Sequence, residues 1–341
     1  MTQITSNTAG DASRSRGVIR RAWGRDAKLA LVIAILIAAI SFRFPQFSSP
    51  RNLAEVLDDS SILILLALGQ MLVMLTRAID LSVASNLALS GMIAALFNRS
   101  FPEAGVPPAL LVAVFSGAIL GAFNGALVWL LRLPSIVVTL GTLSIYRGLI
   151  YVLSKGAWVN SNEMSPAFLA LVRTHFLGLT LVSWLAILGV AILWIVLRFT
   201  TFGRNFFAAG GTPTAAAYAG IDAPRAQFFA FLISGSIAGV CGYLWVSRFA
   251  VAYTDVALGF ELQVIAACLI GGVSISGGVG TVLGVLGGCL FLGVLMNALP
   301  LAGISPFWQM AVNGLVITTA AVLNARADKA GKRSILEAST A

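Results

Sequence analysis

Long apolar runs separated by short polar segments dominate the chain. A bilayer crossing needs about 20 apolar residues in a helix, whereas outer-membrane strands alternate in polarity over about ten residues. The runs here are continuous, which favours helices. The sequence therefore predicts an all-α polytopic membrane protein with about ten transmembrane helices, in the windows 29–42, 60–76, 81–98, 106–131, 133–152, 177–197, 227–247, 262–275, 279–298 and 306–324.

Composition excludes a water-soluble globule. Of the 341 residues, 58% are hydrophobic and 10% are charged, against about 25% charged residues in a soluble domain. No charged residue occurs between Glu261 and Arg326. The basic residues lie at the ends of apolar segments and form no stripe with stacking aromatics, so we expect contact with membrane lipid and no nucleic-acid partner.

The distribution of basic residues predicts the topology. An even number of spans places both termini on one side of the membrane. If that side is the cytosol, it holds 15 of the 22 Lys and Arg residues, as the positive-inside rule requires. We therefore expect an N-in, C-in protein with an uncleaved first span. It divides into a cytosolic tail 1–28, a transmembrane domain 29–325 with a cytosolic loop 198–226, and a cytosolic tail 326–341.

Small residues recur four positions apart in several windows. The spacing clears one helix face for close approach by another helix, so it predicts tight packing between spans. A sliding or rocking interface is the alternative interpretation. The series are Gly117-Gly121-Gly125, Gly235-Gly239 and Gly280-Gly284-Gly288.

Two polar breaks interrupt the apolar runs without leaving room for a loop. They are residues 76–82, with Asp80 and Ser82, and the glycine-rich residues 271–280, with Ser274 and Ser276. Unwound backbone inside a membrane is tolerated beside a cavity or buried in protein. A pair of interrupted helices, one in each half of a chain, is typical of a transport pathway. In the alternative interpretation, Asp80 has only a structural role: it caps the third helix and forms a salt bridge with Arg77.

The polar segment 198–226 contains a complete short helix. Thr212 is a candidate N-cap, Pro213 suits the first helical turn, alanines follow, and Gly220 terminates the run. A helix of about eight residues is marginal in water. It lacks the basic face of a membrane-surface helix, so we expect it to pack in a groove of a partner protein.

Several motifs occur in register and order over residues 50–325. They are Ile79-Asp80-Leu81-Ser82-Val83, Phe202-Gly203-Arg204, Ala208-Ala209-Gly210-Gly211-Thr212-Pro213, Ala219-Gly220-Ile221, Glu261-Leu262, Ile265-Ala266-Ala267 and Ile270-Gly271-Gly272. In these motifs the chain resembles the permease subunits of bacterial ribose-type monosaccharide ABC importers. Residues 133–143 and 304–310 are most similar to the rhamnose-type permeases, and autoinducer-2 permeases come next.

This resemblance implies specific partners. The short helix would be the coupling helix that docks on a cytosolic ATP-binding subunit, through Thr212, Pro213, Ala215, Ala216, Ala219, Gly220 and Ile221. A second permease copy or paralogue and a periplasmic sugar-binding protein would complete an inner-membrane importer. Rhamnose or a similar deoxyhexose is the expected cargo, and autoinducer 2 is the alternative.

The chain lacks the residues for chemistry of its own. Gly331-Lys332 is followed by Arg333, which does not fit a phosphate-binding loop, and His175 is the only histidine. Cys241, Cys268 and Cys289 show no paired or metal-ligand spacing. We expect no catalytic residue, metal or cofactor, with ATP hydrolysed by the partner subunit. An ion-coupled secondary transporter, the main alternative, would need acids within the membrane.

Overall fold

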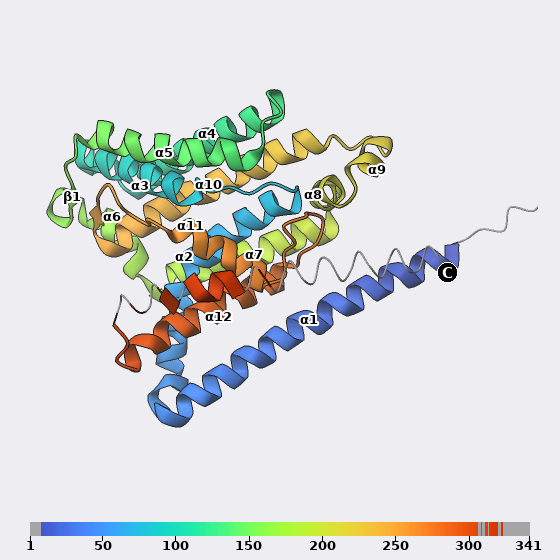
Figure 1. Cartoon of the computed structure of the whole chain (residues 1–341). Helices are drawn as coiled ribbons and strands as arrows, with labels where there is room; N and C mark the ends of the chain where they lie inside the picture. Colours follow the sequence, from blue (N-terminus) through green and yellow to red (C-terminus); the bar gives the residue numbers. More distant parts are fainter. Residues whose placement is uncertain (1–7, 306–307, 309–310, 313, 320–321, 323–341) are drawn as a thin grey trace, which may run out of the picture.

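The computed structural model describes residues 8–305, 308, 311–312, 314–319 and 322. Figure 1 shows a bundle of helices that run roughly along one direction. Six of them are long and apolar enough to cross a membrane, which confirms the all-α polytopic membrane class. These are α2 (Pro50–Leu75), α4 (Val106–Leu130), α5 (Ser135–Ser154), α7 (Leu181–Phe199), α10 (Ala223–Phe249) and α12 (Val282–Leu301).

The remaining elements are further helices and short connectors. Other apolar windows form α1 (Thr8–Arg43), α3 (Val83–Ser100) and α11 (Phe260–Ile270). The connectors include α6 (Pro166–Ala170), α8 (Thr201–Gly211), α9 (Pro213–Tyr218), η1 (Pro45–Ser48), η2 (Pro102–Ala104), η3 (Ser161–Glu163) and η4 (Leu171–Arg173). Strand β1 (Val159–Asn160) pairs with β4 (Val251–Ala252), and β2 (His175–Phe176) pairs with β3 (Leu179–Thr180).

Helices occupy the nine apolar windows between residues 29 and 298, as predicted. Parts of the tenth window, 306–324, and the whole tail 326–341 lie outside the described residues, so ten spans and the N-in, C-in topology stay predictions. Helix α1 begins at Thr8, well inside the segment 1–28 that was expected to be only a tail. That segment contains no proline that would stop the helix.

The start of α7 differs from the predicted window. Residues 175–180 form the β2–β3 hairpin, and Gly178 makes its turn at φ +80°. Helix α7 then begins at Leu181, because the Thr180 side chain accepts a hydrogen bond from the Ser183 amide, 3.2 Å away.

Helix α8 was missed by the sequence analysis, which expected one short helix in segment 198–226. The Thr200 hydroxyl caps its start by accepting from the Gly203 amide at 2.9 Å. Gly203, Phe206, Ala209 and Gly210 are buried on one face. The segment is therefore a partly buried amphipathic helix.

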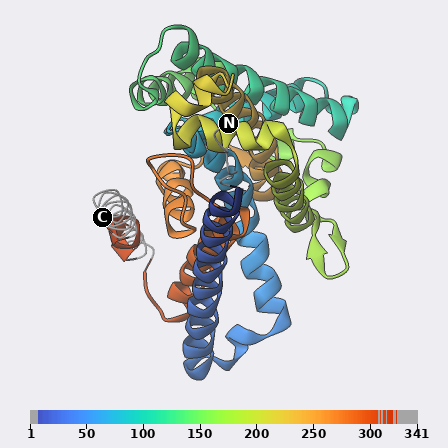
Figure 2. The same ribbon diagram turned by 90° about the vertical axis from the view of Figure 1, so that its right-hand side faces the viewer.

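Helix α2 forms the centre of the bundle. In its most apolar window, 83% of the residues are buried within the chain, as expected for a helix that is apolar on all sides. Helices α3, α4 and α5 lie on one side of α2 and α10, and α7, α11 and α12 lie on the other (Figure 1). Helix α1 is outermost and packs on α12, as the view from the α9 end also shows (Figure 2).

The small-residue series pack against each other as predicted. On α4, Gly117 and Gly121 lie against Gly235 and Gly239 of α10, and a Cβ atom on Gly121 would come within 2.8 Å of the Gly235 Cα atom. Close contact between the two backbones therefore requires glycine at these positions.

Candidate functional site

Helices α8 and α9 lie at one end of the bundle, which we call the α9 end; β1 and α6 lie at the opposite end (Figure 1). The segments that join α2 to α3 and α11 to α12 are the two predicted breaks. Both breaks contact or lie beside α8 in space, so the breaks and the candidate coupling helix belong to one region of the molecule.

The first break begins with a helix-ending turn at Arg77. The Arg77 amide donates to the Met74 carbonyl at 3.0 Å, and the Ala78 amide donates to the Val73 carbonyl at 3.2 Å. This is the hydrogen-bond pattern of a Schellman motif, in which glycine usually takes the left-handed position. Arg77 takes it here with φ +65°, at a cost of about 1–2 kcal/mol for an L residue.

Polar side chains replace the helical hydrogen bonds that the first break loses. In the amide orientation that satisfies both groups, Gln70 donates to the Asp80 carbonyl and accepts from the Asp80 amide, each at 3.2 Å. The Asp80 carboxylate accepts from the Ser82 amide at 2.8 Å and from the Ser82 hydroxyl at 2.7 Å. Both residues are buried. The backbone of a broken helix can stay inside a membrane when it is satisfied in this way.

The network continues into the neighbouring helices. The Asn124 side-chain nitrogen donates to the Ser82 hydroxyl at 2.7 Å, and the Tyr146 hydroxyl donates to the Asn124 side-chain oxygen at 3.2 Å. Asp80 and Ser82 thus contact α4 directly or through one side chain. Arg77 contacts α8 and does not pair with Asp80, so the salt bridge of the alternative interpretation is wrong.

The second break has the same opening turn as the first. The Gly272 amide donates to the Leu269 carbonyl at 3.0 Å, and the Val273 amide donates to the Cys268 carbonyl at 2.9 Å. Gly272 has φ +88°, a conformation that favours glycine. Ser274 is buried in the turn that follows, whereas Ser276 is exposed.

The two breaks meet each other and the end of α8. The Gly278 amide donates to the Leu75 carbonyl at 2.9 Å. The Arg77 guanidinium donates through Nε to the Gly210 carbonyl at 2.5 Å and through Nη2 to the Gly211 carbonyl at 2.8 Å. We call these five residues the junction. Its contacts were not predictable from sequence, because they join positions more than 130 residues apart.

Helix α1 also contacts the second break. The Arg25 guanidinium donates to the Gly272 carbonyl at 3.3 Å, and the Asp26 carboxylate accepts from the Thr281 hydroxyl at 2.9 Å. Burial raises the pKa of the Asp26 carboxyl above its ordinary value, although the Thr281 hydrogen bond and the Arg25 charge act in the opposite direction.

Helix α9, Pro213–Tyr218, confirms the predicted short helix and its glycine stop, but not the capping role of the Thr212 side chain. The Thr212 side chain makes no capping hydrogen bond. Gly220, with φ +75°, ends the helix in a Schellman motif: its amide donates to the Ala217 carbonyl at 3.0 Å, and the Ile221 amide donates to the Ala216 carbonyl at 2.9 Å. A side chain on Gly220 would be strained by the backbone but would meet no atom within 4 Å.

The faces of α9 differ in exposure. Ala216 is buried within this chain, contrary to the expectation that it faces a partner. Thr212, Ala215, Ala219 and Gly220 are exposed, and Pro213 and Ile221 are partly exposed. Tyr218 has 91% of its surface exposed. Helix α9 therefore presents a largely uncharged surface on its free side.

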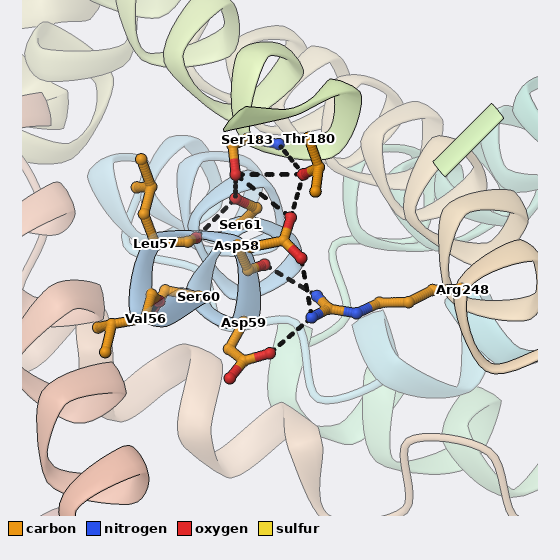
Figure 3. A network of polar contacts seen from close by, with 9 residues as sticks. All are labelled: Val56, Leu57, Asp58, Asp59, Ser60, Ser61, Thr180, Ser183 and Arg248. Atoms are coloured by element: carbon orange, nitrogen blue, oxygen red, sulfur yellow. Dashed lines mark hydrogen bonds and ion pairs between the residues drawn. The ribbon is translucent and has the colours of Figure 1, made fainter. Parts of the chain in front are cut away.

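A charged network that the sequence analysis missed holds the opposite end together (Figure 3). Arg248 of α10 pairs with the carboxylates of Asp58 and Asp59 on α2 at 3.0 and 2.5 Å. Asp58 also accepts from the Thr180 and Ser183 hydroxyls at the start of α7. The network joins α2, α7 and α10 at one level, with one guanidinium between two carboxylates.

The cysteines and the acidic side chains form no metal site in the part of the chain that the structure describes. Cys241, Cys268 and Cys289 are buried and free. Among the described residues, no cluster of three or more His, Cys, Asp or Glu side chains could hold a metal ion.

Comparison with known proteins identifies the family. Residues 52–321 match the family described as "Branched-chain amino acid transport system / permease component". The autoinducer 2 import system permease protein LsrC of Shigella flexneri is 35% identical over 91% of this chain and 90% of its own length. The L-arabinose ABC transporter permease protein AraH of Azospirillum brasilense is 32% identical over 92% and 91% of the two chains. No solved structure matches the chain.

These relatives cover nearly the whole chain and are transport subunits of ABC importers. Together with six apolar helices of spanning length, they place the protein in the inner membrane as a multi-pass subunit without enzyme activity of its own. The chain therefore belongs to the branched-chain amino acid transport system permease family and is a permease subunit of an ABC importer.

Proposed function

We propose that this permease passes a monosaccharide or a related small uncharged molecule across the inner membrane, driven by ATP hydrolysis in a cytosolic partner. The family match over residues 52–321 carries the proposal. A periplasmic binding protein delivers the cargo, and a second permease copy or paralogue completes the pathway. The match favours this importer over an ion-coupled secondary transporter.

In the proposed topology the chain spans the membrane ten times and the α9 end is cytosolic. The distribution of basic residues supports this orientation, since 15 of the 22 fall on that side. Segment 198–226, with α8 and α9, then faces the ATP-binding subunit, while the Arg248 network lies toward the periplasm.

In the proposed coupling mechanism, α9 docks in a cleft of the ATP-binding subunit. Its six residues are too few for a helix that stands alone in water, and the exposed Tyr218, Ala215 and Ala219 offer apolar contact. Thr212, Pro213, Gly220 and Ile221 set the ends of the contact. Ala216 contributes by packing α9 on its own chain.

The two breaks abut the proposed translocation route in different ways. Asp80 and Ser82 are buried and hydrogen-bonded to each other, so they hold the first break in shape. Ser276 is exposed, and Ser274 lies buried beside it. We therefore place the second break nearer to the moving cargo.

For the cargo we propose rhamnose or a similar deoxyhexose, on the resemblance of the sequence motifs. The names of the relatives add autoinducer 2 and L-arabinose as the compounds to compare. The test is accumulation of labelled L-rhamnose, L-arabinose and autoinducer 2 by cells with and without this gene. Loss of L-rhamnose uptake, restored by the gene on a plasmid, supports the proposal. Unchanged uptake of all three compounds contradicts it.

A further inference from the structure

We propose that Arg77 is the positioning residue that transmits movement of the coupling helix α9 to both broken membrane helices. The inference rests on the proposed function and adds the contacts through which movement of α9 reaches the broken helices. It is carried by the junction, where a single side chain of the first break holds the end of the helix that leads into α9.

The backbone at Arg77 has a conformation that favours glycine. The helix-ending turns after α9 and α11 place Gly220 and Gly272 in the left-handed position, whereas the turn after α2 places Arg77 there. Lys155 after α5 and Ala250 after α10 also take it, but neither side chain caps a neighbouring helix among the described contacts. Glycine would adopt this conformation without strain. Strained residues persist where the surrounding structure uses them.

The Arg77 guanidinium caps the C-terminus of α8. Its Nε and Nη2 atoms donate to the Gly210 and Gly211 carbonyls at 2.5 and 2.8 Å. The end of a helix carries partial negative charge, and the planar guanidinium fits two adjacent acceptors. Within the described part of the chain no carboxylate pairs with Arg77, so these carbonyls are the acceptors that position it.

Glycines at the junction bring the three segments into backbone contact. A Cβ atom on Gly210 would lie 2.8 Å from the Gly278 nitrogen, and a Cβ atom on Gly278 would lie 2.6 Å from the Gly211 nitrogen. The Gly278 amide also donates to the Leu75 carbonyl. A shift of α8 therefore acts on the end of α2 through Arg77 and on the second break through Gly278.

The connection to α9 is short. Only Thr212 separates Gly211, the last residue of α8, from Pro213, the first residue of α9. When the ATP-binding subunit moves α9, the Gly210 and Gly211 carbonyls must move with it. The guanidinium that holds them then pulls on the turn at residue 77.

The variant that tests this role is Arg77→Gly, which removes the side chain and relieves the backbone strain. Arg132→Gly is the matched control: Arg132 also has a positive φ, +52°, and its side chain makes no hydrogen bond within the described residues. Both variants are assembled with the ATP-binding subunit and binding protein in proteoliposomes. We then measure ATP hydrolysis and uptake together. The labelled compound is whichever of L-rhamnose, L-arabinose and autoinducer 2 the wild-type assembly imports.

We expect Arg77→Gly to keep the melting temperature, bind the ATP-binding subunit and hydrolyse ATP, while uptake falls by about tenfold or more. Arg77→Lys, which keeps the positive charge but lacks the planar guanidinium, should restore part of the uptake. Arg132→Gly should transport like wild type. Uptake by Arg77→Gly at the wild-type level overturns the inference. So does a loss of uptake matched by a lower melting temperature, because the role is then only structural. Failure of the wild-type assembly to import with ATP would instead contradict the proposed function.

Discussion

Asp80 and Gln70 illustrate how individual side chains maintain a broken helix in a membrane protein. The amide of Gln70 pairs with both backbone groups of Asp80, and the Asp80 carboxylate in turn accepts two hydrogen bonds from Ser82. A buried polar group that lacks a partner is costly. These bonds therefore explain why polar residues stand between two apolar helices.

The account predicts that Asp80 acts here as a hydrogen-bond acceptor. Asp80→Asn keeps an acceptor oxygen, so its free energy of unfolding should change by less than about 1 kcal/mol. Asp80→Leu has no acceptor, so its free energy of unfolding should fall by about 1–3 kcal/mol. Melting of the purified variants in detergent measures both. Equal losses in the two variants would show that hydrogen bonding is not what Asp80 contributes.

At the scale of single residues, the sequence predicted where polar residues interrupt the helices but not which side chains contact each other. The breaks at 76–82 and 271–280 were visible because polar residues and glycines interrupt apolar runs. The contact between Arg77 and α8 was not visible, and the alternative interpretation paired Arg77 with Asp80 instead. A left-handed backbone at an arginine leaves no signal in the residue type, and it decides where the side chain points.

Helix α9 shows how two faces of one short element take different roles. Ala215 is exposed and Ala216 is buried within the chain, although the two residues are neighbours. The periodicity of six residues is too short to reveal this difference. The sequence therefore predicted the helix and its glycine stop, but not its buried face or the preceding helix α8.

Substitution of the two alanines should separate docking from folding. Ala215→Asp adds a charge on the free face, so the permease should keep its melting temperature and lose copurification with the ATP-binding subunit. Ala216→Asp buries an unpaired charge and should itself destabilise the permease, by about 3 kcal/mol or more. If Ala215→Asp still copurifies and transports normally, α9 is not the coupling helix.

The exposure of the second break makes a separate prediction about access. Ser276→Cys should react with a water-soluble maleimide, while Ser82→Cys and Ser274→Cys should not, because Ser82 and Ser274 are buried. The three native cysteines are buried and give little background. Reactivity at position 276 should change when the partner binds ATP. Faster labelling at position 82 than at 276 would place the route beside the first break instead.

At the scale of the whole molecule, the sequence predicted the architecture well because membrane helices need long apolar runs. Nine predicted windows contain helices, and the glycine series pack as expected. The charged network of Arg248 with Asp58 and Asp59 was missed, since it joins α2 and α10 through the fold. Orientation depends on the membrane, so it rests on the distribution of basic residues.

The topology is tested with reporter fusions. A reporter that is active only in the cytosol should be active when fused after Arg225, and one that is active only in the periplasm should be active when fused after Arg173. The basic residues at the α9 end are the physical reason. The reversed pattern would place α9 in the periplasm and remove the basis for coupling.

The central claim is that this permease imports its cargo with energy from ATP hydrolysed by a partner. The most direct measurement is uptake of labelled L-rhamnose, L-arabinose and autoinducer 2 into proteoliposomes that contain the assembled permease, ATP-binding subunit and binding protein. We expect accumulation of one of the compounds to require ATP and to persist when ionophores collapse proton and sodium gradients. Accumulation without ATP that stops with ionophores would contradict the account.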